Sequence, residues 1–156
     1  MNDRETLTAA TSTAARGRRA ITAVLVLLAA ICALVGAYAT LAPHSFYRHV
    51  VGVDMLGPYN QHLLTDVGGL YLGFAITFYL AAVTLSRELI RASCFGFAAT
   101  QSLHSLYHVL HLSHFTVVRA TEQTIGIGAF VALPLIALAL NRHERFPAPP
   151  HSPQVR

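Results

Sequence analysis

Charged side chains are scarce in this sequence. They make up 12% of its 156 residues, whereas an ordinary soluble domain is about one quarter charged, and apolar residues make up 54%. The missing charge indicates that much of the protein faces lipid. Four membrane spans of roughly 20 residues each would use most of the chain, which excludes a separate soluble catalytic domain.

Cysteine is also rare, and the two that occur exclude a disulfide framework. Cys32 falls near the middle of the first apolar run and Cys94 at the start of the third. At a helical rise of 1.5 Å per residue their depths in a membrane would differ by roughly 15 Å, which no disulfide bridges. We expect two buried thiols that pack as small apolar groups.

The motifs of several enzyme classes are missing. The sequence contains no phosphate loop, dinucleotide fingerprint, nucleophile elbow or HExxH zinc motif. Its 11 basic residues are all arginine and lie beside apolar runs instead of forming a basic face, which argues against nucleic acid as a partner. An enzyme is therefore expected only if histidines bind a catalytic metal.

Four apolar runs are present, and they predict an all-α fold: a polytopic membrane protein with a bundle of four transmembrane helices. The expected helices cover about residues 20–42, 62–85, 92–115 and 123–140. The tails at 1–19 and 142–156 are predicted to be disordered. Residues 43–61 predict an interfacial loop with one short amphipathic turn, and residues 86–91 predict a charged turn.

The first apolar run has a second interpretation. Arg18 and Arg19 precede it, and Ala37, Tyr38 and Ala39 form a small-residue cleavage site, a pattern that also occurs in secretory signal peptides. The run is long for a signal peptide, so we expect a retained membrane span.

The placement of arginine predicts the orientation, because cytoplasmic flanks retain basic residues. Nine arginines fall on one side of the expected bundle: Arg4, Arg16, Arg18, Arg19, Arg87, Arg91, Arg142, Arg145 and Arg156. Two, Arg48 and Arg119, fall on the other. Both termini are therefore expected in the cytoplasm.

Small residues predict where helices approach each other closely. Gly69 and Gly73 have the GxxxG spacing, and Ala92 and Gly96 repeat the spacing in the next run. Such residues let helix backbones pack together in lipid. We expect this packing within the bundle, with a homo-oligomer as the alternative.

Polar residues form two stripes in the second and third runs. His62 and Asp66 share a helix face with Gly69 and Gly73, at spacings of four, three and four. The second stripe has spacings of three, four and three and consists of Gln101, His104, His108 and His111. Asp66 lies about 6 Å below His62, and His108 about 9 Å below the outer end of its helix. The two stripes are therefore predicted to meet, with Asp66 paired to a histidine.

Three interpretations of this polar cluster remain open. The first is structural: the buried polar groups satisfy one another by hydrogen bonds. The second is a site for a transition metal or haem, with His62, Asp66, His108 and His111 as ligands. The third is proton or substrate passage through an Asp/His pair.

The segments YNQHLLTDVGGLYLGFA and QSLHSLYHVLHLSHF resemble small uncharacterised four-helix integral membrane proteins of bacteria, over about residues 59–115. The matching positions are Asn60, His62, Asp66, Gly68 and the histidines from 104 to 114. The resemblance implies a multi-pass protein of the bacterial inner membrane but carries no activity. We expect a membrane scaffold or accessory protein that contacts lipid and either itself or another membrane protein. The alternatives are a metal- or haem-binding protein and a small proton-coupled transporter.

Overall fold

The computed structural model describes residues 3–55 and 57–143, and within them the protein is all-helical, as predicted. It contains five α-helices and one short 3-10 helix: α1 (Asp3–Leu41), α2 (Pro43–His49), α3 (Gln61–Thr84), α4 (Arg87–Leu110), η1 (Leu112–His114) and α5 (Val117–His143). Asn60 begins α3, because its side chain accepts a hydrogen bond from the backbone of Leu63 at 3.0 Å.

Three segments are long and apolar enough to cross a membrane: Ala15–Leu41, Gln61–Thr84 and Val117–Arg142. They support the prediction of a membrane protein. Helix α4 is as long as α3, at 24 residues, but its apolar content is lowered by Arg87, Glu88 and Arg91 near its start and by polar side chains in its C-terminal half. The structure therefore identifies three candidate spans by composition where the sequence predicted four.

Helix α1 begins much earlier than expected. The structure places residues 3–19 in the helix, so the predicted disordered tail is wrong for this segment. The segment is rich in alanine and contains no proline, and a helix that is already nucleated by an apolar span extends at little cost. The predicted tail at 144–156 lies outside the described residues.

The charged turn predicted at 86–91 is also replaced by helix. Helix α4 starts at Arg87, with Ser86 as its N-cap, so only Leu85 and Ser86 separate it from α3. Arg87 Nη2 donates to the carbonyl oxygens of Asn141 and Arg142, each at 3.2 Å. The arginine thereby satisfies carbonyls at the end of α5 and joins the two helix ends. The short amphipathic turn predicted within 43–61 is confirmed as α2.

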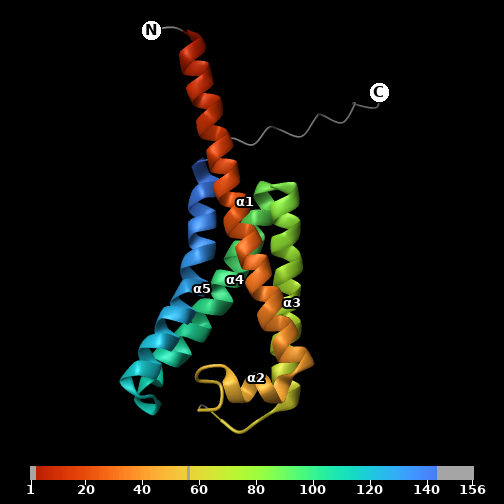
Figure 1. Cartoon of the computed structure of the whole chain (residues 1–156), viewed down its shortest axis with the longest axis vertical. Helices are drawn as coiled ribbons and strands as arrows, with labels where there is room; N and C mark the ends of the chain where they lie inside the picture. The colour runs from red at the N-terminus through yellow and green to blue at the C-terminus, as the bar shows by residue number, and fades with distance from the viewer. Residues whose placement is uncertain (1–2, 56, 144–156) are drawn as a thin grey trace.

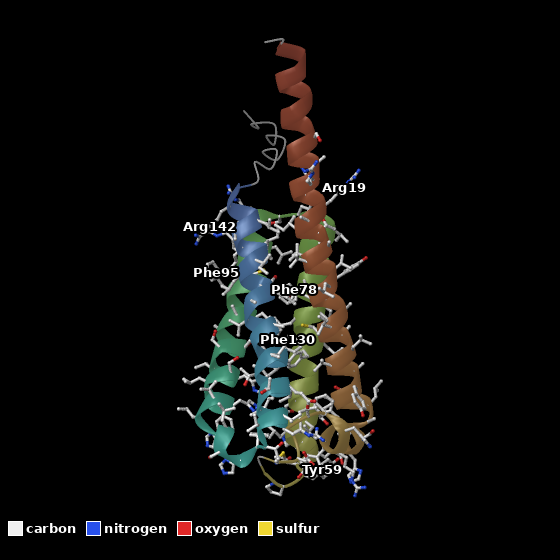
Figure 2. All side chains as sticks on the ribbon, turned by 60° about the vertical axis from the view of Figure 1, so that its left-hand side comes forward. Arg19, Tyr59, Phe78, Phe95, Phe130 and Arg142 are labelled. Carbon is white, nitrogen blue, oxygen red and sulfur yellow. The ribbon has the colours of Figure 1, made fainter. Side chains whose placement is uncertain are left out.

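The four long helices form two antiparallel pairs, α1 with α3 and α4 with α5 (Figure 1). The pairs meet at the end where Arg19 and Arg142 lie, and they diverge toward the opposite end, near Tyr59 (Figure 2). Helix α2 lies across that open end. We call the end with Arg19 and Arg142 the arginine end and the other the loop end.

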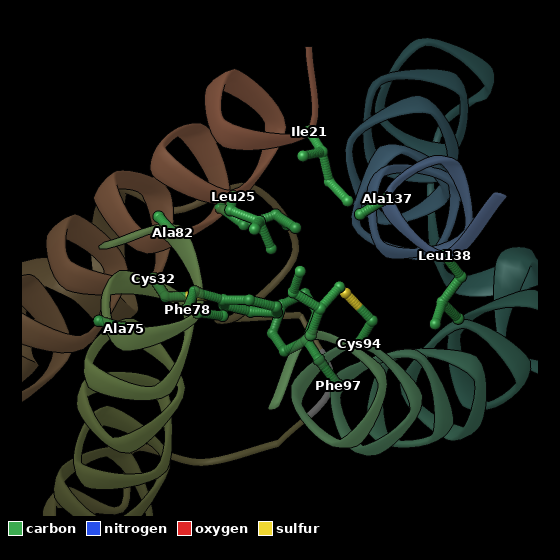
Figure 3. Close-up of a cluster of buried hydrophobic side chains, with 13 residues drawn as sticks. Ile21, Leu25, Cys32, Ala75, Phe78, Ala82, Cys94, Phe97, Ala137 and Leu138 are labelled. Atoms are coloured by element: carbon green, nitrogen blue, oxygen red, sulfur yellow. The ribbon is translucent and has the colours of Figure 1, made fainter. Parts of the chain in front are cut away.

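The main hydrophobic core is a cluster of buried side chains (Figure 3), and its member Phe78 lies nearer the arginine end than the loop end (Figure 2). Its buried residues come from all four long helices: Ile21, Leu25, Leu28, Cys32, Ala75, Phe78, Ala81, Ala82, Ile90, Cys94, Phe97, Ala137 and Leu138. The Phe97 ring lies at its centre, 5.0 Å from Phe74 and 5.3 Å from Phe78 in edge-to-face contacts. Both cysteines are free and buried, as predicted.

Glycine allows α1 and α3 to cross closely. A Cβ atom placed on Gly36 would lie 2.8 Å from the carbonyl oxygen of Gly68, and one placed on Gly68 would lie 2.9 Å from that of Gly36. Distances this short are excluded for real Cβ atoms, so both positions require glycine while the backbones remain this close. The glycine of α3 that contacts α1 is therefore Gly68 and not the neighbouring Gly69 predicted from the GxxxG spacing.

Gly69 and Gly73 lie elsewhere. Added Cβ atoms at these two positions would meet nothing within 4 Å, so the predicted packing inside the bundle is wrong for both. Each residue turns a helix by 100°, so Gly69 faces well away from the crossing once Gly68 faces α1. In the pair predicted on α4, Ala92 is exposed, whereas an added Cβ on Gly96 would make an ordinary 3.7 Å contact with Phe74.

A matched pair of substitutions tests the crossing. Gly36→Ala should destabilise the protein by about 1 to 3 kcal/mol, because the added methyl group overpacks backbone against backbone. Gly73→Ala should leave stability unchanged or raise it slightly, because the methyl group enters open space and alanine favours helix. Thermal unfolding in detergent measures both; equal melting temperatures for the two variants would contradict the crossing.

Candidate functional site

The structure does not bring the six predicted polar residues into one cluster. It separates them into three contacts at different places: His62 with Asp66, Gln101 with Tyr71, and a histidine row on α4 that meets Gln123 of α5. All three lie outside the main core listed above, and the last two join different helices. We refer to the latter two together as the polar layer.

His62 and Asp66 pair with each other on α3. The Nδ1 of His62 lies 3.0 Å from the Oδ2 of Asp66, and the two side chains are 85% and 60% exposed. Asp66 thus pairs within its own helix, not with a histidine of α4 as predicted. His62 and Asp66 do share one face of the helix, as their spacing predicts. The rotation of α3 that places Gly68 against α1 turns this face away from the bundle.

Tyr71 and Gln101 connect α3 to α4 in the bundle interior. Gln101 Nε2 donates to Tyr71 Oη at 3.1 Å, and this hydroxyl in turn donates to Gln101 Oε1 at 3.3 Å. Gln101 is buried, so its amide finds its partner in the protein. Tyr71 also packs edge-on against Phe97 and Phe130, which places this contact directly beside the aromatic core.

The histidines in the C-terminal half of α4 form a row that continues to His111, directly after the helix. The rings of His104 and His108 are 4.5 Å apart, and His111 stacks on Tyr107 at 4.2 Å. His108 Nδ1 contacts the side-chain amide nitrogen of Gln123, which joins α4 to α5. The sequence predicted the row itself but not its partner on α5.

Gln123 is the residue that sequence reasoning missed. It is only 5% exposed, and its Oε1 has no hydrogen-bond partner in the described chain. Ser105 Oγ, one turn before His108, is likewise buried without a partner. The only hint in the sequence is a glutamine at the start of an otherwise apolar run, a position that the sequence predicts as the beginning of the fourth helix.

The loop after α2 covers Gln123. Gly52 has a φ of +86°, and a Cβ added there would collide with Gln123 Oε1 and lie 3.2 Å from the Phe115 ring. Only glycine adopts this backbone conformation at low cost. The loop therefore ties the α1/α3 pair to the α4/α5 pair where the pairs diverge.

The positions of the four predicted ligands can be compared with the needs of a metal or haem site. Among the described residues, no three or more His, Cys, Asp or Glu side chains are grouped so that they could hold a metal ion. Of the four predicted ligands, His62 and Asp66 form one pair on α3, while His108 lies on α4 and His111 directly follows that helix. The polar layer as arranged can form hydrogen bonds between helices.

No protein-family model, no curated protein and no solved structure matches this chain. The resemblance to four-helix membrane proteins of bacteria stays a prediction. The function is therefore inferred from the arrangement of the described residues.

Substitution at Gly52 tests the contact between the loop and α5. Gly52→Ala should destabilise the protein by about 1 to 2 kcal/mol from backbone strain alone, with a further loss from the collision with Gln123. The double variant Gly52→Ala/Gln123→Ala should relieve the collision, so the two substitutions should be non-additive in thermal unfolding. Gly57→Ala is the control, since a Cβ there meets nothing within 4 Å. Additive effects would contradict the contact.

Proposed function

We propose that this chain is a small four-span protein of a bacterial inner membrane, with both termini in the cytoplasm. The proposed role is that of a scaffold or accessory protein that binds another membrane helix through the uncovered face of α3. We define the α3 face as His62, Asp66, Gly69 and Gly73.

The direction of the helices supports four spans. Helices α3 and α5, which are both long and apolar enough to span, run in the same direction, from the loop end to the arginine end (Figure 1). The chain must return between them, and α4 is the segment that does so. Its polar side chains fit this role, because Gln101 and His108 bond to neighbouring helices instead of facing lipid alone.

The single observation that carries the scaffold proposal is the openness of the α3 face. Gly69 and Gly73 have no neighbour within 4 Å of an added Cβ, and His62 and Asp66 are exposed beside them. Glycines let a second helix approach closely, and a polar pair offers hydrogen bonds that lipid tails cannot match. A face with both features suits a partner helix better than lipid.

Reporter fusions test the orientation. Fusions after Arg19, Arg91 and Arg142 should all report cytoplasm, because arginines concentrate at that end. A reporter inserted at Gly57, in the loop-end segment, should report the opposite side. A non-cytoplasmic signal at Arg91 would overturn the four-span arrangement, because α3 would then not cross the membrane.

Photo-crosslinking in native membranes tests the scaffold role. A photoreactive amino acid at Gly69 should crosslink to protein, whereas one at Gly126 should crosslink to lipid. The two glycines are matched: both meet open space, and they lie eight and nine residues from the starts of α3 and α5, hence at similar depth. Lipid adducts alone at Gly69 would contradict a partner helix on the α3 face.

A further inference from the structure

We propose that the partner on the α3 face is a second copy of this protein, inserted in the same orientation, so that two α3 helices pack side by side. This inference rests on the proposed function, since it names the partner of the same face. The observation behind it is the His62/Asp66 ion pair, together with its position on a membrane helix.

Among the side chains that the structure describes, His62 and Asp66 form the single acid–base pair, and it lies on a surface that no described part of the chain covers. Asp66 is five residues from the start of α3, or about 8 Å along the helix. An ionisable group at such depth is costly when it faces lipid and needs polar partners. At 60% exposure, Asp66 has one such partner in His62 and room for another.

A second copy supplies that partner by symmetry. The His62 imidazole and the Asp66 carboxylate meet 3.0 Å apart, so these two groups differ in depth by no more than that distance. A second copy in the same orientation places its own pair at the same depth, and each carboxylate is then within reach of the imidazole of the other copy. The donor and acceptor groups of the face are thus complementary to themselves, whereas an unrelated helix would have to match them independently. Positions 62, 66, 69 and 73 also repeat at four, three and four residues, the spacing of a seam between parallel helices.

The glycines of the α3 face allow two copies of α3 to approach each other closely. Gly69 and Gly73 leave open space, so the two helices can come close enough for extensive packing, which drives helix association in lipid. Exposed apolar side chains flank the glycines on α3, among them Leu70, Ile76 and Leu80. They would continue the contact from the ion pairs toward the arginine end.

Energy transfer between two fluorescently labelled populations of the full chain measures the association, in vesicles of phosphatidylethanolamine and phosphatidylglycerol at increasing lipid dilution. Gly69→Ile/Gly73→Ile should weaken self-association about tenfold. Gly126→Ile/Gly128→Ile should change it by less than about twofold, since these control glycines of α5 are equally open. All four positions are exposed, so each variant should fold like the wild type.

An exchange of charges tests the reciprocal pairing. His62→Asp puts two carboxylates on each face and Asp66→His puts two imidazoles there, so each variant alone should self-associate about tenfold more weakly. A mixture of the two variants should associate nearly as well as the wild type, because each copy then offers the other the opposite group. An interaction confined to one helix predicts no recovery on mixing.

The outcomes separate this inference from the proposed function. Association that is lost in the Gly69/Gly73 variant and recovered in the mixture supports a second copy, as does a Gly69 crosslink product near 33.6 kDa, twice 16.8 kDa. A wild type that stays monomeric, or a mixture without recovery, overturns the inference. If Gly69 then crosslinks to a different protein, the scaffold role stands without self-association; if it crosslinks to lipid alone, both proposals fail.

Discussion

The close crossing of α1 and α3 at Gly36 and Gly68 is the constraint on which the rest of the arrangement depends. Because backbone meets backbone there, the rotation of α3 has little freedom. With Gly68 facing α1, the same helix points Phe78 into the core and leaves Gly69 and Asp66 outside. A rotation by one residue would exchange these roles. The crossing thus determines both which side of α3 enters the core and which face of α3 stays uncovered.

The bundle has an apolar half and a polar half. Near the arginine end, Phe78, Phe97 and the two cysteines are fully buried among apolar neighbours. Toward the loop end, the polar layer joins the helices through Tyr71 with Gln101 and through His108 with Gln123. At Phe97 the hydrogen-bonded groups are followed by edge-to-face aromatic rings. A proton path would have to continue past these rings, so the arrangement favours a structural role for the polar layer, as a connection between helices.

Helix positions could be predicted from the sequence where local chemistry determines them, but helix rotations could not. Residues 62–85 were predicted for α3 and Gln61–Thr84 is observed, because Asn60 provides a local cap. The face of α3 was predicted wrongly, since Gly68 and Gly69 are adjacent glycines in a helix whose apolar residues lie on all sides beyond its first turns. The contact between His108 and Gln123 depends on how α5 is aligned against α4, which no local pattern encodes. The α1 extension was missed because composition alone does not show that a neighbouring span can propagate helix into it.

Disulfide formation with the native Cys32 measures the rotation of α3 most directly. Cys32 of α1 and Ala75 of α3 belong to the same buried cluster (Figure 3), and these two helices form the closer-packed pair. Oxidation of an Ala75→Cys variant in membranes should therefore form an intramolecular disulfide with Cys32 and block both thiols from alkylation. Ile76→Cys, one residue further along α3 and 61% exposed, should form no intramolecular disulfide with Cys32 under the same conditions. A disulfide in the Ile76→Cys variant and none in Ala75→Cys would contradict the orientation of α3 and, with it, the uncovered face.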